Sequence, residues 1–287
     1  MENTNHGSLN LEWRTRRKEA AAYIRSRTTL EPQIGVILGS GLGCLAHEIK
    51  SATVIPYREI PHFPVSSVAG HAGELILGEL EGKRVVAMNG RFHYYEGWTM
   101  QQVVFPVWVM RTLGASTLIA TNAAGGVNRS FVPGDLMIIV DHVNLLFSNP
   151  LIGPNDPELG VRFPAMSQAY PWELVELAQR AADAEGIHVQ RGVYLATQGP
   201  MYTTPAESQF YRVLRADAVG MSTVPEVIAA THAGMKTLGI SCITDTAGDP
   251  KAGPRGVLTH EEVLAVANRT MPKFVRLMKA IVRMMDV

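Results

Sequence analysis

Cysteine is scarce in this sequence of 287 residues. Its two cysteines, Cys44 and Cys242, stand far apart in apolar surroundings, and neither belongs to a ligand cluster of cysteines and histidines. Such usage argues against a disulfide framework and against a zinc site. We expect both thiols to be free and buried, since cysteine is among the residues most often found inside proteins.

A surplus of charge is missing too. The chain has 26 basic and 26 acidic residues, so no global field attracts nucleic acid or an anionic membrane. No window approaches the apolar length of a membrane span, and the first residues lack the apolar core of a signal peptide. We therefore expect a cytoplasmic protein whose partner is a small ligand, with no nucleic acid and no membrane involved.

Strand and helix signals alternate along the chain. A helical pattern over 9–28 opens it, and another helix begins at Thr259. Between them, short apolar runs bounded by turn residues predict strands, including a hairpin around 81–82. We expect one α/β domain over 1–287, in which 1–30 form a helical segment and a central mixed β-sheet is flanked by helices.

Polar residues follow two strands in the first half. The turn "GSGLG" (39–43) offers backbone N–H groups and the Ser40 hydroxyl to an anion, although a plain strand-to-helix turn has the same composition. Its spacing is not the G-x-G-x-x-G of a dinucleotide fold. Farther along, Arg91, His93 and Tyr95 alternate, so an extended chain would project all three to one side. Arginine beside histidine suits phosphate, but a surface strand would alternate in the same way.

Two later strands end in the same manner. The segment "TNAAGG" (121–126) has small residues that let backbone amides approach a ligand, and Met221 and Ser222 precede a helix in "GMSTVPE". Ligands of open α/β sheets collect at the carboxyl ends of strands. The four polar strand ends together predict one pocket for an oxyanion next to a small organic group.

An acid at the end of a buried strand is unusual. In "GISCITDTAG" (239–248) an apolar strand runs into Asp245. Removing a carboxylate from water is costly unless it gains a partner. That partner is either a basic residue of the following loop, Lys251 or Arg255, or a bound ligand.

Six segments carry a family resemblance: "GSGLG", "GHAGEL", "GRFHYYEG", "TNAAGG", "RFPAMSQAY" and "GMSTVPEV". In this order and spacing, they make residues from about 35 to 260 resemble the trimeric, low-molecular-mass class of purine nucleoside phosphorylases. The resemblance implies the nucleoside phosphorylase fold and a homotrimer. It also implies cleavage of purine nucleosides by phosphate, giving the free base and ribose 1-phosphate with inversion, without a metal or an organic cofactor.

The resemblance further assigns residues to the three parts of the substrate. Phosphate would be held by Ser40, His71, Arg91, His93, the amide of Ala123, and Ser222. Ribose would be held by Tyr95, Met221 and His260, with Phe163 of the long loop 149–171 reaching into a neighbouring subunit. The base would be held by Asn122, Ala123, Ala124, Tyr202, Thr203, Thr244 and Asp245. His93, Asp245, Ser40 and Arg91 would be the catalytic groups.

Two base-site positions depart from the family's pattern. Thr203 stands where a glutamate is usual, and Asp245 stands where an asparagine is usual. An ionised Asp245 can only accept hydrogen bonds, so it would repel a 6-oxo group and accept from a 6-amino group, which favours adenosine. A protonated Asp245 could instead donate to N7 as that nitrogen gains negative charge. A methylthioadenosine phosphorylase is an alternative, although His260 suits a 5′-hydroxyl better than a methylthio group. A non-catalytic nucleoside-binding protein is another.

Overall fold

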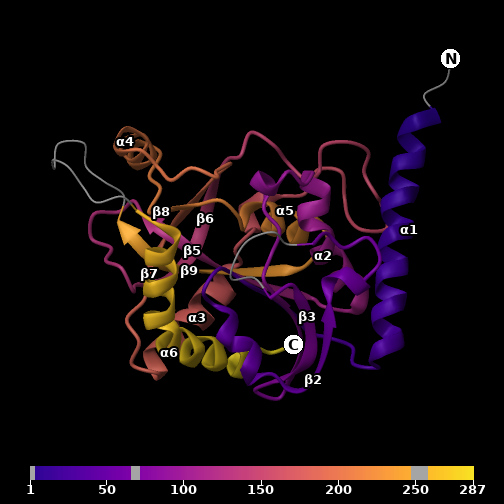
Figure 1. Ribbon diagram of the computed structural model, residues 1–287, viewed down its shortest axis with the longest axis horizontal. Helices are drawn as coiled ribbons and strands as arrows, with labels where there is room; N and C mark the ends of the chain where they lie inside the picture. Colours follow the sequence, from indigo (N-terminus) through magenta and orange to yellow (C-terminus); the bar gives the residue numbers. More distant parts are fainter. Residues whose placement is uncertain (1–3, 66–71, 247–257) are drawn as a thin grey trace.

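The computed structural model describes residues 4–65, 72–246 and 258–287. In these ranges it has one nine-stranded mixed sheet with helices on both faces, which confirms the expected fold class (Figure 1). The strands are β1 (Ile34–Leu38), β2 (Lys50–Pro56), β3 (Glu74–Leu80), β4 (Lys83–Asn89), β5 (Thr117–Gly126), β6 (Leu136–Leu145), β7 (Gln190–Thr197), β8 (Ala218–Gly220) and β9 (Lys236–Thr246).

The sheet combines an open part and a closed part. Its strand order is β2-β3-β4-β1-β5-β8-β7-β6-β9, and β9 also pairs with β5, so the last five strands of this order form a ring. Strands β1, β4, β5 and β9 are connected by parallel pairings, which bring their carboxyl ends to one edge. This edge is where a ligand site is expected in an α/β fold.

Helices cover both sides of the sheet. On one side α2 packs against β1 and α5, and α1 packs on α2 from outside, along one edge of the molecule (Figure 1). On the other side α3 and α6 pack against each other and against β9. The α-helices are α1 (Thr4–Arg27), α2 (Met100–Leu113), α3 (Trp172–Ala184), α4 (Pro205–Val213), α5 (Val224–His232) and α6 (His260–Met284), and the 3₁₀ helices are η1 (Gly43–Glu48), η2 (Tyr57–Glu59), η3 (Tyr94–Glu96) and η4 (Met166–Gln168).

Three helices begin with the same local sequence rule. A threonine N-cap accepts from the third backbone N–H of the helix, and a glutamate or glutamine there accepts from the N-cap N–H, at the starts of α2, α4 and α6. This reciprocal cap satisfies two donors that a helix otherwise leaves unpaired. At α6 the N-cap is Thr259, so His260 is the first residue of the helix, and the cap fixes the position of its backbone.

The predicted hairpin is present, and its turn shows why. Strands β3 and β4 pair antiparallel up to Leu80 and Lys83, which leaves a two-residue turn. Both turn residues, Glu81 and Gly82, have positive φ, at 50° and 77°. Such two-residue turns match the natural twist of the strands they join.

One cysteine differs from expectation. Cys242 is buried in β9, as predicted, but the prediction for Cys44 is wrong because this thiol is exposed. The segment after the glycine turn forms the short 3₁₀ helix η1, which turns Leu45 and Ala46 inward and leaves Cys44 outside. Within the described residues, none of the helices is long and apolar enough to cross a membrane.

Candidate functional site

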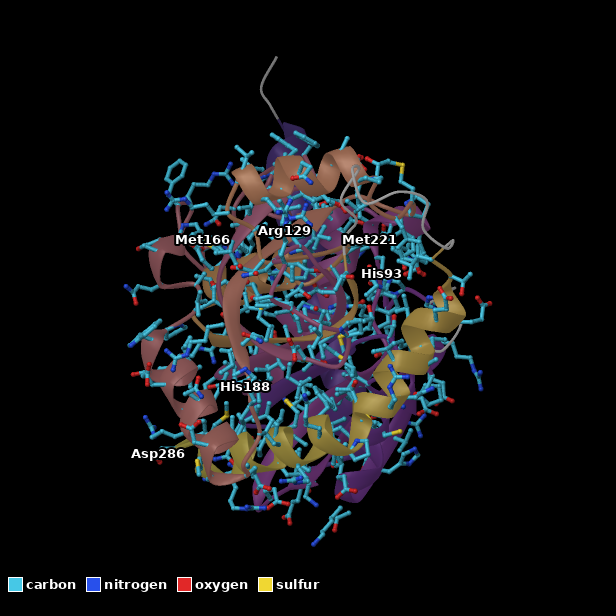
Figure 2. The ribbon with its side chains drawn as sticks, turned by 90° about the vertical axis from the view of Figure 1, so that its left-hand side faces the viewer. His93, Arg129, Met166, His188, Met221 and Asp286 are labelled. Atoms are coloured by element: carbon cyan, nitrogen blue, oxygen red, sulfur yellow. The ribbon has the colours of Figure 1, made fainter. Side chains whose placement is uncertain are left out.

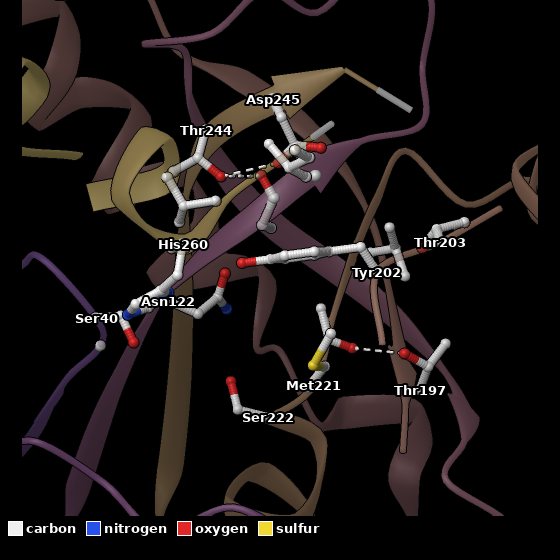
Figure 3. A pocket seen from close by; sticks show the side chains of 18 of the residues that line it. Ser40, Asn122, Thr197, Tyr202, Thr203, Met221, Ser222, Thr244, Asp245 and His260 are labelled. Carbon is white, nitrogen blue, oxygen red and sulfur yellow. Dashed lines mark hydrogen bonds between the residues drawn. The ribbon is translucent and has the colours of Figure 1, made fainter. Parts of the chain in front are cut away.

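A cavity of about 800 Å³ lies at the carboxyl ends of the strands (Figure 3). Almost all of the residues predicted for the site line it, although they come from segments far apart in the sequence. These are Ser40, Arg91, His93, Tyr95, Asn122, Ala123, Ala124, Tyr202, Thr203, Met221, Ser222, Thr244, Asp245 and His260. Figure 2 shows His93 and Met221 close together near the first turn of α6.

Two predicted residues are not among them. His71 lies outside the described residues. Phe163 belongs to the irregular connection between β6 and α3, where its side chain is 87% exposed and does not reach the cavity of its own chain.

Arg91 is fixed by two contacts behind the cavity wall. It is only 1% exposed, its Nε donates to Glu226 Oε1 at 2.8 Å, and its Nη1 donates to the backbone oxygen of Thr121 at 2.5 Å. The extended path considered from the sequence does not continue as far as Tyr95, because β4 ends at Asn89, His93 is still extended, and the 3₁₀ helix η3 begins at Tyr94. Arg91, His93 and Tyr95 nevertheless reach the same cavity.

The ring of His93 is oriented by an acid. Glu96 Oε1 accepts from the His93 backbone N–H at 2.8 Å and lies 3.1 Å from Nδ1, while the ring stacks on Tyr95 with 4.7 Å between centroids. Burial lowers the pKa of His93, which favours the neutral imidazole. A neutral ring that donates from Nδ1 to the carboxylate accepts at Nε2. It can therefore receive a hydrogen bond from a hydroxyl of a sugar or of a protonated phosphate.

Buried histidines also predict how stability depends on pH. Burial lowers the pKa of His93 and His232 below the ordinary 6.5, so on acidification the unfolded chain takes up these protons before the native protein does. Stability is then lost as pH falls below about 6.5, by up to about 1.4 kcal/mol per unit for each group. We expect the melting temperature to fall between about pH 7 and pH 5.

The variant His232→Gln provides the control, because its amide can still donate to Asn155 Oδ1, which lies 2.9 Å from His232 Nε2. It should weaken the pH dependence. Burial raises the pKa of Asp245, so this group makes the native protein less stable as pH rises above about 3.8, which is opposite to the effect of the histidines. Comparing the unmodified protein with His232→Gln isolates the histidine contribution, because Asp245 is the same in both. A melting temperature that depends on pH equally in both proteins would contradict the assignment.

The start of α5 holds a strained turn beside the cavity. Thr223 has φ 71° and ψ −51°, and Val224 N donates to Ser222 O at 2.8 Å, which together define a γ-turn with positive φ. For a β-branched residue this conformation costs about 1–3 kcal/mol and persists only where its surroundings enforce it. The Thr223 hydroxyl accepts from Asn122 Nδ2 at 2.9 Å. The turn thereby places the Ser222 side chain on the cavity wall.

Small residues of β5 make room for the acid of β9. Segment 121–126 was expected to end a strand, and β5 does run through Gly126, with a shift in its register against β9 after Ala124. A Cβ at Gly125 would lie 3.0 Å from Asp245 Oδ2. Glycine therefore lets the carboxylate stand beside the strand.

Asp245 has one short polar contact. The Thr244 hydroxyl donates to its Oδ1 at 3.0 Å, and within the described ranges no basic side chain pairs with it. Burial raises the pKa of Asp245. Lys251 and Arg255, the alternative partners expected from the sequence, lie outside the described residues. In Figure 3 the Tyr202 ring lies across the cavity below Thr244 and Asp245.

His260 brings an unpaired nitrogen to the cavity wall. Its Nε2 is buried and has no hydrogen-bond partner in the part of the chain that the structure describes. Since buried polar atoms are normally paired, this nitrogen is suited to a hydroxyl of a bound molecule. Val263, one helical turn later, extends the same wall.

Some cavity residues were missed by the sequence analysis. Thr197 ends β7 and could have been found by the strand-end argument applied to the other strands. Leu258, Glu262 and Val263 line the cavity without any motif to single them out. Within 4–65, 72–246 and 258–287, no group of three His, Cys, Asp or Glu side chains is placed to hold a metal ion, and a metal-free reaction stays a prediction.

Comparison with known proteins identifies relatives over almost the whole chain. A family model described as "Phosphorylase superfamily" matches residues 33–283. Purine nucleoside phosphorylase 1 of Geobacillus stearothermophilus is 57% identical over 272 residues, covering 95% of this chain and 98% of that protein. The Bos taurus purine nucleoside phosphorylase is 46% identical, covering 92% and 93%.

Solved structures agree. The Schistosoma mansoni purine nucleoside phosphorylase in complex with adenosine matches with a TM-score of 0.90 and 40% identity, covering 94% of this chain and 97% of that one. The same enzyme in complex with inosine also has a TM-score of 0.90. The chain belongs to the phosphorylase superfamily and, within it, to the purine nucleoside phosphorylases, which are pentosyltransferases.

Proposed function

We propose that the cavity binds a purine nucleoside beside inorganic phosphate and cleaves the glycosidic bond, giving the free base and ribose 1-phosphate with inversion at C1′. One observation carries the proposal: Ser40, Arg91, His93 and Ser222, which come from three separate segments because Arg91 and His93 share one, line a single cavity together with the predicted base-site residues. An arginine, an imidazole and hydroxyl groups are the donors and acceptors that a phosphate needs.

The chemistry needs no nucleophile from the protein. As the glycosidic bond breaks, the sugar becomes cation-like and the base gains negative charge. A phosphate held against the ribose stabilises the positive charge of the sugar and is itself the attacking group. Hydrogen-bond donors near the purine stabilise the negative charge of the base. His260 would hold the 5′-hydroxyl, with Tyr95 and Met221 against the sugar. Catalysis then comes from positioning and electrostatics, without a metal or an organic cofactor.

Phosphate dependence tests this proposal directly. Incubation of the protein with a purine nucleoside should release free base only when phosphate is added, and phosphorus NMR should show one ribose 1-phosphate for each base released. Release of base at the same rate without phosphate would indicate a hydrolase instead. Binding of nucleoside without turnover in phosphate would indicate the non-catalytic alternative.

The base site supports a preference for 6-aminopurines. Asp245 lines the cavity and would face the purine, while Thr203, which also lines it, provides no carboxylate to accept from the ring N1–H of a 6-oxopurine. An ionised carboxylate facing O6 would cost on the order of 1–3 kcal/mol, which changes substrate preference about tenfold to a hundredfold. His260 at the sugar end favours adenosine over methylthioadenosine.

Exposed apolar side chains after β6 support a homotrimer. Phe147, Val161 and Phe163 are 84%, 65% and 87% exposed on the connection that follows β6. Large apolar side chains exposed on one connection are suited to an interface with another subunit. Phe163 would complete the ribose site of a neighbouring subunit. The predicted location of the protein remains the cytoplasm.

Replacing Phe163 with alanine should therefore raise the nucleoside KM up to about tenfold while the melting temperature changes little, because an exposed side chain adds little to stability. Mixed trimers provide the control. A His93→Ala subunit supplies Phe163 but has a damaged site, and a Phe163→Ala subunit has the reverse defects. Mixing and reassembling the two should restore activity above that of either alone. No restoration in mixed trimers would contradict the shared site.

A further inference from the structure

Glu226 contacts Arg91 from behind the cavity. Both side chains are almost fully buried, with 2% and 1% exposure, and the 2.8 Å contact joins Glu226 Oε1 to Arg91 Nε. Arg91 lines the cavity, whereas Glu226 does not. Since the backbone oxygen of Thr121 holds Nη1 as well, two nitrogens of the planar guanidinium are fixed, and so is the direction in which the remaining N–H groups point.

The position of Glu226 on its helix matters as much as this contact. It is the third residue of α5, in the first turn, where the helix dipole stabilises a negative charge. The same helix start carries Ser222, placed on the cavity wall by the γ-turn at Thr223. The start of α5 therefore presents one predicted phosphate ligand itself and holds another, Arg91, through its acid.

We propose that Glu226 is a positioning residue for phosphorolysis. It keeps the Arg91 guanidinium in one orientation and at a fixed position relative to Ser222, so that the phosphate site is preorganised. Without the acid, a long side chain loses its charge-assisted contact and its counter-charge. This inference rests on the proposed use of Arg91 to bind phosphate.

Kinetics of Glu226→Ala test the proposal. At saturating nucleoside, the phosphate KM should rise about tenfold to a hundredfold, since small misplacements of a binding group have effects of this size. The nucleoside KM should change less than about threefold, because uniform loss of binding to one substrate leaves the other unaffected. Glu226→Gln keeps an acceptor oxygen for Nε, so the same rise should be smaller. This second variant decides the matter if Glu226→Ala does not fold.

Glu81→Gln is the matched control. Glu81 Oε2 pairs with Arg283 Nη2 at 2.7 Å in the β3–β4 hairpin, away from the cavity, so its loss should lower the melting temperature and leave both KM values unchanged. A double-mutant cycle with Arg91→Lys should show that the Glu226 effect shrinks once Arg91 is replaced. Folded Glu226 variants with an unchanged or lowered phosphate KM, or with both KM values raised equally, would overturn the role of Glu226. If Arg91→Lys itself leaves the phosphate KM unchanged, the proposed function fails first.

Discussion

Asp245→Asn should lower the ratio of kcat/KM for adenosine to that for inosine by about tenfold to a hundredfold. The carboxylate can only accept hydrogen bonds when ionised, whereas an asparagine amide can also donate to O6. The space that Gly125 leaves beside Asp245 holds an amide of the same size, so the fold should tolerate the change. Steady-state kinetics with adenosine, inosine, guanosine and methylthioadenosine measure the shift.

Thr203→Glu should act in the same direction, because a carboxylate there can accept from the ring N1–H of a 6-oxopurine, and the double variant should show the largest shift. Asp141→Asn is the control, since Asp141 is an exposed acid of β6 that does not line the cavity. If the ratio in Asp245→Asn equals that of the unmodified protein, Asp245 has no part in selecting the base.

Arg91→Lys should reduce kcat/KM for phosphate by about a hundredfold to a thousandfold, the effect seen when one preorganised donor to a developing charge is lost. Lysine keeps the positive charge next to Glu226, but its ammonium group is a point charge without the planar fork of arginine. It cannot contact Glu226, Thr121 O and a phosphate in the same geometry.

Nucleoside affinity distinguishes this loss from general damage. With phosphate left out, Arg91→Lys should bind adenosine with a dissociation constant within about threefold of the unmodified protein. A parallel loss of nucleoside and phosphate binding would instead mean that Arg91 supports the whole cavity.

The sequence predicted which residues line the cavity better than it predicted the backbone conformation that brings them there. Arg91, His93 and Tyr95 were placed together by a period of two, but the chain leaves β4 at Asn89, so Arg91 and His93 lie in an irregular connection and Tyr95 in the 3₁₀ helix η3. The strand-end argument succeeds because parallel strands bring their carboxyl ends to one edge whatever the local turn geometry. Exact side-chain directions depend on those turns.

Partners far apart in sequence could not be predicted in this way. Glu226 is 135 positions from Arg91, and no pattern of periodicity or spacing connects them. The exposure of Cys44 was missed for a related reason, since composition does not distinguish an α-helix from a short 3₁₀ helix. By contrast, the hairpin at 81–82 and the helix start at Thr259 depend on neighbouring residues alone, and both were found.

A crystal structure with adenine and phosphate bound tests the central claim most directly. We expect one phosphate within hydrogen-bond distance of Ser40, Arg91, His93 and Ser222, and an adenine whose 6-amino group donates to Asp245. A phosphate bound elsewhere, or an adenine that turns its 6-amino group away from Asp245, would contradict the account.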